Sequence, residues 1–174
     1  MTRILIGVIG PGETAAPAAM QTAAALGTAI ARQGWGLLTG GRAAGVMGAA
    51  SQGARAANGL VVGVLPGVDT AQMSAAVDIA ICTGLGQGRN VINVLSSRVV
   101  IACGIGPGTL SEIALALKLH KPLILLEIAP EMTTAIAHMA PAAELAIAPT
   151  VTAAIAQTQE FLREDECSLY ARGE

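Results

Sequence analysis

The sequence predicts a single α/β domain in which a mostly parallel β-sheet lies between two layers of helices, a three-layer αβα arrangement. Short runs rich in β-branched residues alternate with longer alanine-rich stretches, as expected for strands that alternate with helices. The strand-like runs are apolar throughout, which indicates burial on both faces. Of the 174 residues, 53% are hydrophobic and 13% are charged, so one domain with a large core is expected and disorder is excluded.

The apolar runs and the Gly, Pro and Asn residues between them place each element. Gly34 and Asn58-Gly59 end the first two helices, and Pro66-Gly67 stops the third strand. We expect strands over residues 4–9, 36–39, 61–65, 78–82, 98–103, 122–126 and 144–148. We expect helices over residues 14–33, 43–57, 89–96, 110–119, 130–139 and 150–163. Helices between successive strands imply right-handed crossover connections, and the sheet is therefore expected to be mostly parallel. The domain is expected to span residues 1–166 and to be followed by a C-terminal tail, residues 167–174.

The composition excludes two classes of partner. Ten Lys and Arg against twelve Asp and Glu give a net charge of -2, too few positive charges for a nucleic-acid-binding face. Aromatic residues are only 2%, which disfavours base recognition by stacked rings. The uncharged stretch 14–31 contains Pro17, Gln21 and three Thr, so we expect it to insert poorly into a membrane. No cleavable leader is indicated, and we expect a cytoplasmic protein.

The three cysteines, Cys82, Cys103 and Cys167, are odd in number and widely spaced. This spacing indicates no disulfide framework and favours a reducing compartment. Cys82 and Cys103 end apolar strands, so we expect them to be small core residues. No His, Cys or Asp spacing fits a zinc or iron site, and we expect no catalytic metal ion.

Glycine-rich loops follow four of the expected strands. In an open parallel sheet, ligands bind beyond the carboxyl ends of the strands, where these loops lie. Each loop leads to a helix start, whose free N–H groups and dipole favour an anion, and glycine lets a phosphate approach the backbone. The chain has neither a P-loop nor a GxGxxG after the first strand. The sequence therefore favours a phosphate-bearing small molecule as the ligand. Its mode of binding is expected to differ from that of P-loop ATPases and from that of typical dinucleotide-binding folds.

Two charged residues flank these loops. Arg89 stands at an expected helix start, where a cation is unfavourable unless it holds an anion, so it either binds an anionic ligand or pairs with a neighbouring carboxylate at the surface. Glu112 lies three residues after Thr109, the spacing of a capping box. Glu112 is therefore expected to cap the helix, to face the ligand, or to do both.

Three further residues have two possible roles each. Arg42 either binds an anion at the mouth of the site or stays in solvent. Glu13 either contacts the ligand or stabilises a helix N-terminus by its charge, and we favour the second role. Met47 is expected to be a packing residue rather than a ligand contact.

Two segments resemble the signatures of the LOG family in the wider SLOG superfamily. Residues 40–48, GGRAAGVMG, resemble the segment GG-x-x-x-G-[LV]-M-G of that family. Residues 104–112, GIGPGTLSE, resemble its second signature, P-G-G-x-G-T-x-x-E. Arg89 precedes the second segment by fifteen residues, at the position of an arginine of the family. The resemblance extends to about Leu126, roughly two thirds of the chain.

Residues 109–122 and the pair Arg89-Asn90 are most similar to the molybdenum cofactor carrier branch of this superfamily. That resemblance implies a Rossmann-like fold, a homodimer or homotetramer, and binding of molybdopterin-bound molybdenum as cargo without turnover. The phosphate of the cofactor would lie on the glycine loops. The expected binding residues are Gly10, Gly12, Gly40, Gly41, Arg42, Gly45, Met47, Arg89, Gly106, Gly108, Thr109 and Glu112.

The enzymes of the family offer the main alternative. Resemblance to them implies a phosphoribohydrolase that cleaves N6-modified adenosine monophosphate, with Arg89 and Glu112 as the catalytic pair. Three departures favour the carrier: Ile105 stands where the enzymes have Gly, Asn90 where they usually have Lys, and Arg98 where they usually have Asp. A regulatory domain that senses a nucleotide is a third possibility.

Overall fold

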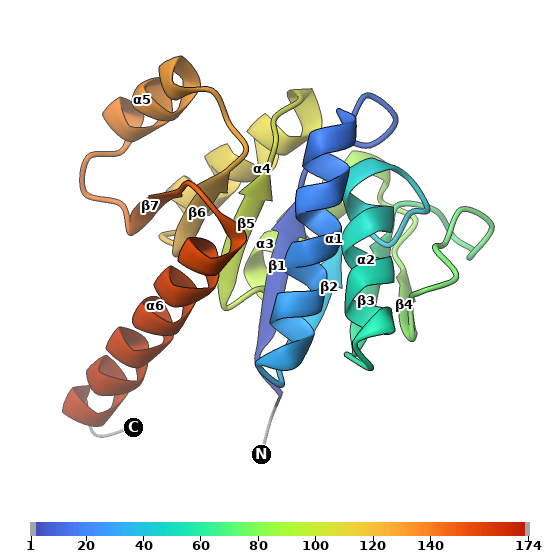
Figure 1. Cartoon of the computed structure of the whole chain (residues 1–174), viewed down its shortest axis with the longest axis horizontal. Coiled ribbons are helices and arrows are strands. Elements are labelled where there is room, and N and C mark those ends of the chain that lie inside the picture. The colour runs from blue at the N-terminus through green and yellow to red at the C-terminus, as the bar shows by residue number, and fades with distance from the viewer. Residues whose placement is uncertain (1–2, 173–174) are drawn as a thin grey trace.

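The computed structural model describes residues 3–172, and for residues 165–172 the backbone alone. In this part of the chain, strands and helices alternate as the sequence predicts (Figure 1). The strands are β1 (Leu5–Ile9), β2 (Gly36–Thr39), β3 (Val61–Leu65), β4 (Ile79–Cys82), β5 (Val99–Cys103), β6 (Leu123–Leu126) and β7 (Leu145–Ala148). The helices are α1 (Pro17–Arg32), α2 (Gly45–Ala56), the 3-10 helix η1 (Gly86–Arg89), α3 (Asn90–Ser96), α4 (Pro107–Lys118), α5 (Pro130–Met139) and α6 (Val151–Arg172).

The seven described strands form one sheet in the order β4-β3-β2-β1-β5-β6-β7. Every pairing in it is parallel. The chain runs outward from β1 to β4, then returns to pair β5 with the other side of β1. The strand order therefore reverses between β1 and β5, the position where doubly wound sheets bind ligands. The predicted Rossmann-like, three-layer αβα fold is confirmed.

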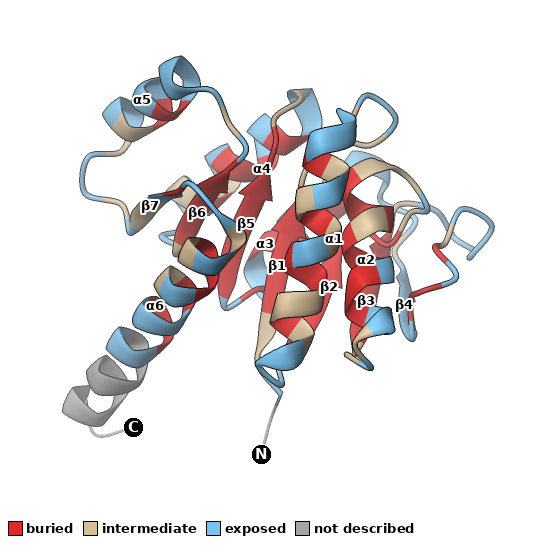
Figure 2. Cartoon of the chain, in the orientation of Figure 1, coloured by how far each residue is buried: buried red, intermediate tan, exposed pale blue. Residues whose placement is uncertain are grey.

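Helices cover both faces of the sheet, and the core lies between the layers (Figure 2). On one face, α1, α2 and α6 pack against alternate residues of the strands, such as Ile6 and Val8 of β1. On the other face, α3, α4 and α5 pack against the residues between them, such as Ile9. Most strands are thus buried on both sides, as their uninterrupted apolar runs predict.

Helices α1 and α2 pack closely because glycines face each other's backbone. A Cβ on Gly27 would lie 2.0 Å from the carbonyl oxygen of Ala50, and one on Gly53 would lie 1.9 Å from that of Ala24. Only glycine fits at these two positions, and the small alanines around them allow the same short separation of the helices.

Several predictions about individual elements are wrong. Strand β4 is the edge of the sheet, and all four of its residues are exposed, because the 66–78 connection before it supplies no covering helix. Cys82, at its end, is therefore exposed rather than in the core, whereas Cys103 is buried as predicted. The side chain of Cys167 lies outside the described residues.

Two helices begin three residues away from the predicted start, and one ends later. Helices α1 and α4 begin at Pro17 and Pro107, because proline is favoured in the first turn of a helix. Helix α6 continues past Arg163 to Arg172, since the first glycine after Arg163 in the sequence is Gly173. The division into a domain of residues 1–166 and a tail stays a prediction. Within the described residues, the structure has no helix that is both long and apolar enough to cross a membrane.

Candidate functional site: a polar pocket at the switch point

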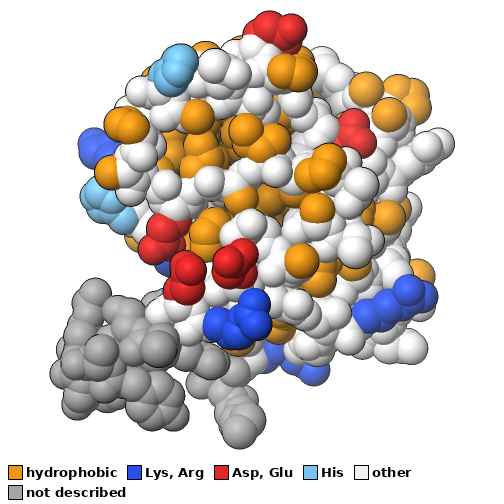
Figure 3. All heavy atoms as spheres, turned by 60° about the vertical axis from the view of Figure 1, so that its left-hand side comes forward, with side chains coloured by type: hydrophobic (Ala, Val, Ile, Leu, Met, Phe, Trp, Pro, Cys, Tyr) orange, Lys and Arg blue, Asp and Glu red, His pale blue; other side chains and the backbone are white. Residues whose placement is uncertain are grey.

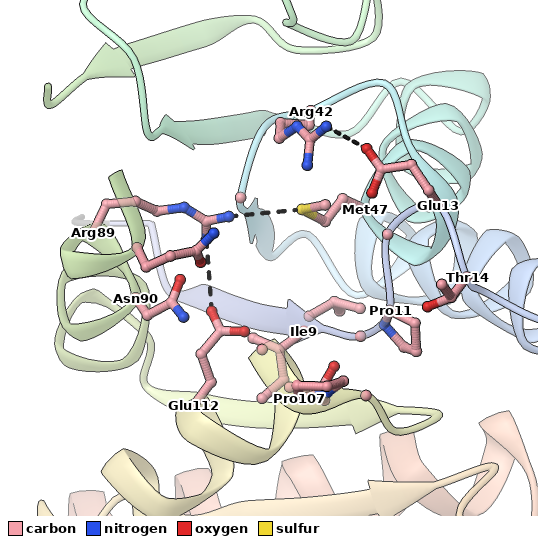
Figure 4. A pocket seen from close by; sticks show the side chains of 18 residues that line it. Ile9, Pro11, Glu13, Thr14, Arg42, Met47, Arg89, Asn90, Pro107 and Glu112 are labelled. Carbon is pink, nitrogen blue, oxygen red and sulfur yellow. Dashed lines mark hydrogen bonds and ion pairs between the residues drawn. The ribbon is translucent and has the colours of Figure 1, made fainter. Parts of the chain in front are cut away.

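A cavity of about 200 Å³ opens beyond the carboxyl ends of β1, β2 and β5, where the strand order reverses (Figure 4). The loops after these three strands form its walls, together with residues from η1, α3 and α4. Most of the residues predicted to bind the ligand come together here. They are Gly10, Gly12, Gly40, Arg42, Met47, Arg89, Gly106, Gly108, Thr109 and Glu112. Their role in binding stays a prediction.

The N-terminus of α4 forms one wall of the pocket. The N–H groups of Gly108 and Thr109 belong to its first turn, where no intrahelical partner exists, and the helix dipole adds positive potential. A Cβ on Gly108 would meet no atom within 4 Å, so a ligand can approach the backbone. Thr109 is buried, and its Oγ1 has no hydrogen-bond partner among the described residues. The wall thus offers backbone and hydroxyl donors to an anion.

The predicted capping box is wrong. Pro107 occupies the first position of α4 and Gly106 is its N-cap, with no side-chain capping bond, so Thr109 lies inside the first turn. Glu112 consequently lies one turn further along and does not reach back to a loop N–H. Its carboxylate accepts a hydrogen bond from Asn93 instead, at 3.0 Å.

Arg89 and Glu112 form a buried ion pair across the pocket. Arg89 Nη1 lies 3.6 Å from Glu112 Oε1, and the two side chains are 9% and 8% exposed. Burial raises the pKa of Glu112, against the opposing effects of Asn93 and Arg89, and burial lowers the pKa of Arg89. Arg89 therefore pairs with a carboxylate, but inside the pocket rather than at the surface. Its Nε is buried without a partner in the described structure, so the guanidinium keeps a free donor.

Glycine at position 40 lets this guanidinium lie close against the loop after β2. A Cβ on Gly40 would lie 2.5 Å from Arg89 Nη2 and 2.6 Å from Met47 Sδ. Met47 Sδ itself is 4.0 Å from Arg89 Nη2. Met47 therefore packs against Arg89, as expected of a packing residue, and also lines the pocket.

Arg42 and Glu13 form a second ion pair at the rim of the pocket, as Figure 4 shows. It joins the loop after β2 to the loop after β1. The prediction that Glu13 stabilises a helix N-terminus is wrong, because α1 begins only at Pro17 and has no acidic residue in its first turn. Arg42 Nε is buried without a partner among the described residues.

Two of the predicted binding residues, Gly41 and Gly45, lie behind the pocket wall. Both have positive φ, 73° and 49°. A Cβ on Gly41 would lie 3.0 Å from Gly63 Cα, and one on Gly45 would lie 2.0 Å from the carbonyl oxygen of Gly12. They shape the loops that line the pocket rather than its surface.

Sequence analysis did not identify Asn93 and Gln87 as parts of the site. Asn93 holds Glu112, and Gln87 lines the pocket. Asn93 lies four residues, about one helical turn, after Arg89, which directly precedes α3, and this spacing could have pointed to it. Gln87 precedes Arg89 in a glycine-rich turn, and nothing in its spacing distinguishes it.

A family model described as the SLOG cluster4 family matches residues 3–158. The chain belongs to the SLOG cluster4 family. The predicted membership of the SLOG superfamily is thereby confirmed. Both signature segments, residues 40–48 and 104–112, contribute residues to the pocket.

Two solved structures and one further relative are similar to this SLOG protein over most of its length. The molybdenum cofactor binding protein from Rippkaea orientalis is 52% identical, with a TM-score of 0.90, over 93% of this chain and 99% of that one. The Moco carrier protein from Chlamydomonas reinhardtii is 46% identical, with a TM-score of 0.88, over 94% and 99% of the two chains. An uncharacterised protein from Archaeoglobus fulgidus is 45% identical over 118 residues, which are 68% of this chain and 76% of that protein.

The pocket contains groups of the kind that bind anions. It combines a helix N-terminus, a guanidinium and a buried hydroxyl, which are donors to phosphate oxygens. No group of three or more His, Cys, Asp or Glu side chains that could hold a metal ion occurs among the residues that the structure describes. Ile105, the departure from the enzyme signature, packs against the core beneath α4 and does not line the pocket.

Proposed function

We propose that this protein is a cytoplasmic carrier that binds the molybdenum cofactor as cargo, with the phosphate of the pterin on the glycine loops and without turnover. One observation carries the proposal: the chain is 52% identical, over nearly the whole length of both chains, to a molybdenum cofactor binding protein. The pocket supports it independently, because its donors suit a phosphorylated small molecule.

The contacts suggest how the cargo would be oriented. The phosphate would lie against the N-terminus of α4, where Gly108, Thr109 Oγ1 and the free Nε of Arg89 offer donors. The remaining part of the molecule would extend between Met47 and Glu112, which line the same cavity. When bound, the cofactor would supply the metal centre for a recipient enzyme, and this chain would hold and shield it.

Native mass spectrometry after anaerobic mixing with molybdenum cofactor tests the proposal. We expect one bound cofactor per chain, and a reduced occupancy in Gly108→Ala, whose methyl group would enter the space in front of α4. Gly67→Ala is the matched control: Gly67 is exposed, a Cβ there meets only ordinary contacts at 3.9 Å, and the residue does not line the pocket. No bound mass in the unchanged protein, or equal loss in both variants, would refute this assignment.

A LOG-type phosphoribohydrolase is a second candidate, favoured by one observation. Arg89 and Glu112, which match the catalytic pair of those enzymes, meet at 3.6 Å inside the pocket. Cleavage of an N-glycosidic bond needs protonation of the leaving base and stabilisation of an oxocarbenium ion. Incubation with AMP and N6-isopentenyl AMP separates the candidates, since release of free base that disappears in Glu112→Gln would establish the enzyme.

We also propose that the chain forms a homodimer or homotetramer. The open edge at β4 exposes Ile79 and Ile81. At the other side of the molecule, α5 exposes Met132 and Met139, and the edge strand β7 exposes Ile147. Figure 3 shows hydrophobic side chains gathered in a hollow on the face that carries α5 and β7. Apolar surface of this kind suits self-association. Light scattering that gives a monomer mass at micromolar concentration would contradict it.

A further inference from the structure

The two ion pairs of the pocket differ in what it costs to separate them. The four ionisable side chains that line it, Glu13, Arg42, Arg89 and Glu112, form two pairs, so the empty pocket is formally neutral. Separating Arg89 from Glu112 would leave a carboxylate buried without its counter-charge, which is strongly unfavourable. Glu13, by contrast, is 66% exposed and Arg42 is 28% exposed, and pairs exposed to this degree contribute little stability.

Arg42 can leave Glu13 by a movement of its side chain alone. Its backbone is held in place by a bridge to Met73, and the neighbouring residues Gly41 and Ala43 bond to Ser74 and Gln72, respectively. Its Nε is buried without a partner, so the guanidinium has donors that Glu13 does not use. Both side chains line the cavity, and a rotation of Arg42 keeps its charge at the pocket.

We propose that the Glu13 carboxylate competes with the ligand for Arg42. Glu13 pairs with Arg42 while the pocket is empty, and the anionic group of the ligand replaces Glu13 as the partner of Arg42 on binding. Arg89 stays with Glu112 and adds only its free Nε, whereas Arg42 supplies a full positive charge. Glu13 thereby lowers the affinity of the pocket for the ligand. It also makes the pocket selective for anions that compete effectively with a carboxylate, such as a phosphate dianion. This inference deepens the proposed function and rests on it only in that the ligand carries a phosphate.

A double-mutant cycle with inorganic phosphate as the probe tests the competition. Binding is followed by calorimetry or by phosphorus NMR, with phosphate in the millimolar range. Glu13→Gln should tighten binding about two- to fivefold, the strength of an exposed ion pair. Arg42→Gln should weaken it about tenfold, as for loss of a hydrogen bond to a charged group. In the Arg42→Gln background, Glu13→Gln should then have no further effect.

A matched control and the folding of each variant make every outcome decisive. Glu144→Gln removes one exposed carboxylate just before the edge strand β7, does not change a residue that lines the pocket, and should leave phosphate binding unchanged. Thermal unfolding identifies a variant that does not fold, and Arg42→Lys, which keeps the charge, then replaces Arg42→Gln with a smaller expected loss.

Three results would overturn the inference. The first is an unchanged affinity for phosphate in Glu13→Gln. The second is an equal gain in affinity from Glu13→Gln in the presence and absence of Arg42, which would indicate simple repulsion of the anion by Glu13. The third is no phosphate binding in any variant. Cofactor loading is measured separately on the unchanged protein. A failure to load with an intact cycle would refute the carrier function and leave the competition standing.

Discussion

Replacing Gly45 by alanine should destabilise the protein by more than the cost of placing a non-glycine residue at a positive φ. Gly45 begins α2 with φ of +49°, and a Cβ there would lie 2.0 Å from the carbonyl oxygen of Gly12 and 2.3 Å from that of Pro11. The same contact region contains the hydrogen bond from Val46 N to the Pro11 carbonyl, at 3.0 Å. The added methyl group must therefore push the loop after β1 away from α2.

The size of the effect follows from two contributions. A non-glycine residue in the left-handed region costs roughly 1–2 kcal/mol, and overpacking against backbone costs about 1–3 kcal/mol more. A total of about 3 kcal/mol corresponds to a fall in Tm of roughly 6–12 °C for a chain of this size. Urea unfolding gives the free energy directly.

Gly34→Ala separates the two contributions. Gly34 has φ of +77°, but a Cβ there would meet no atom within 4 Å, so this variant carries only the conformational cost of about 1–2 kcal/mol. Gly45→Ala should also weaken phosphate binding, because the displaced loop contributes Gly10 and Gly12 to the pocket, whereas Gly34→Ala should not. Equal losses of stability in the two variants would refute the reasoning.

Three further predictions concern the pocket and the cysteines. Gly108→Ala should leave the protein as stable as before or about 0.5–1 kcal/mol more stable, yet weaken phosphate binding about tenfold; unchanged binding in a titration would contradict this. Iodoacetamide at mildly alkaline pH should modify Cys82, which is exposed, and spare Cys103, whose pKa burial raises to about 12; peptide mass spectrometry that finds both modified equally fast would count against it. Burial raises the pKa of Glu112 above its ordinary 4.5, so the folded state holds that proton more tightly than the unfolded state, and this contribution to stability is lost as the pH rises through the raised pKa. The Tm of the protein relative to Glu112→Gln should therefore fall from about pH 4.5 upward, and a constant difference would show that the carboxyl titrates normally.

The fold could be predicted from the sequence because its signals are local. Uninterrupted apolar runs identified the seven described strands, and Gly34 and Asn58-Gly59 marked helix ends close to those observed. Burial of a strand depends instead on what covers it. The runs of β3 and β4 look alike in sequence, but only β3 has neighbours on both sides, so the exposure of β4 and Cys82 follows from topology.

The location of the pocket could be predicted as well, because the carboxyl ends of parallel strands meet at one edge. The pairing of its charges could not. The separations of Arg89 from Glu112 and of Glu13 from Arg42 along the chain carry no periodic signal, since each pair joins loops or helices that follow different strands. The capping-box prediction failed for a related reason: Thr109 and Glu112 have the right spacing, but Pro107 starts the helix before either of them.

A carrier has to release its cargo as well as bind it, and the arrangement of charges in this pocket suits both requirements. A pocket with two uncompensated guanidinium groups would hold a phosphate dianion strongly and let it go slowly, because differences in affinity among related complexes arise mostly in the dissociation rate. Here Arg89 is compensated by Glu112 in the interior, and Arg42 by Glu13 at the surface. In the proposed competition, backbone N–H groups of α4 would supply a fixed part of the attraction, and Arg42 would supply a part that is lost when it pairs with Glu13 again. The dissociation rate would thus depend on an exposed carboxylate at the rim, where a recipient protein can reach it without disturbing the buried pair.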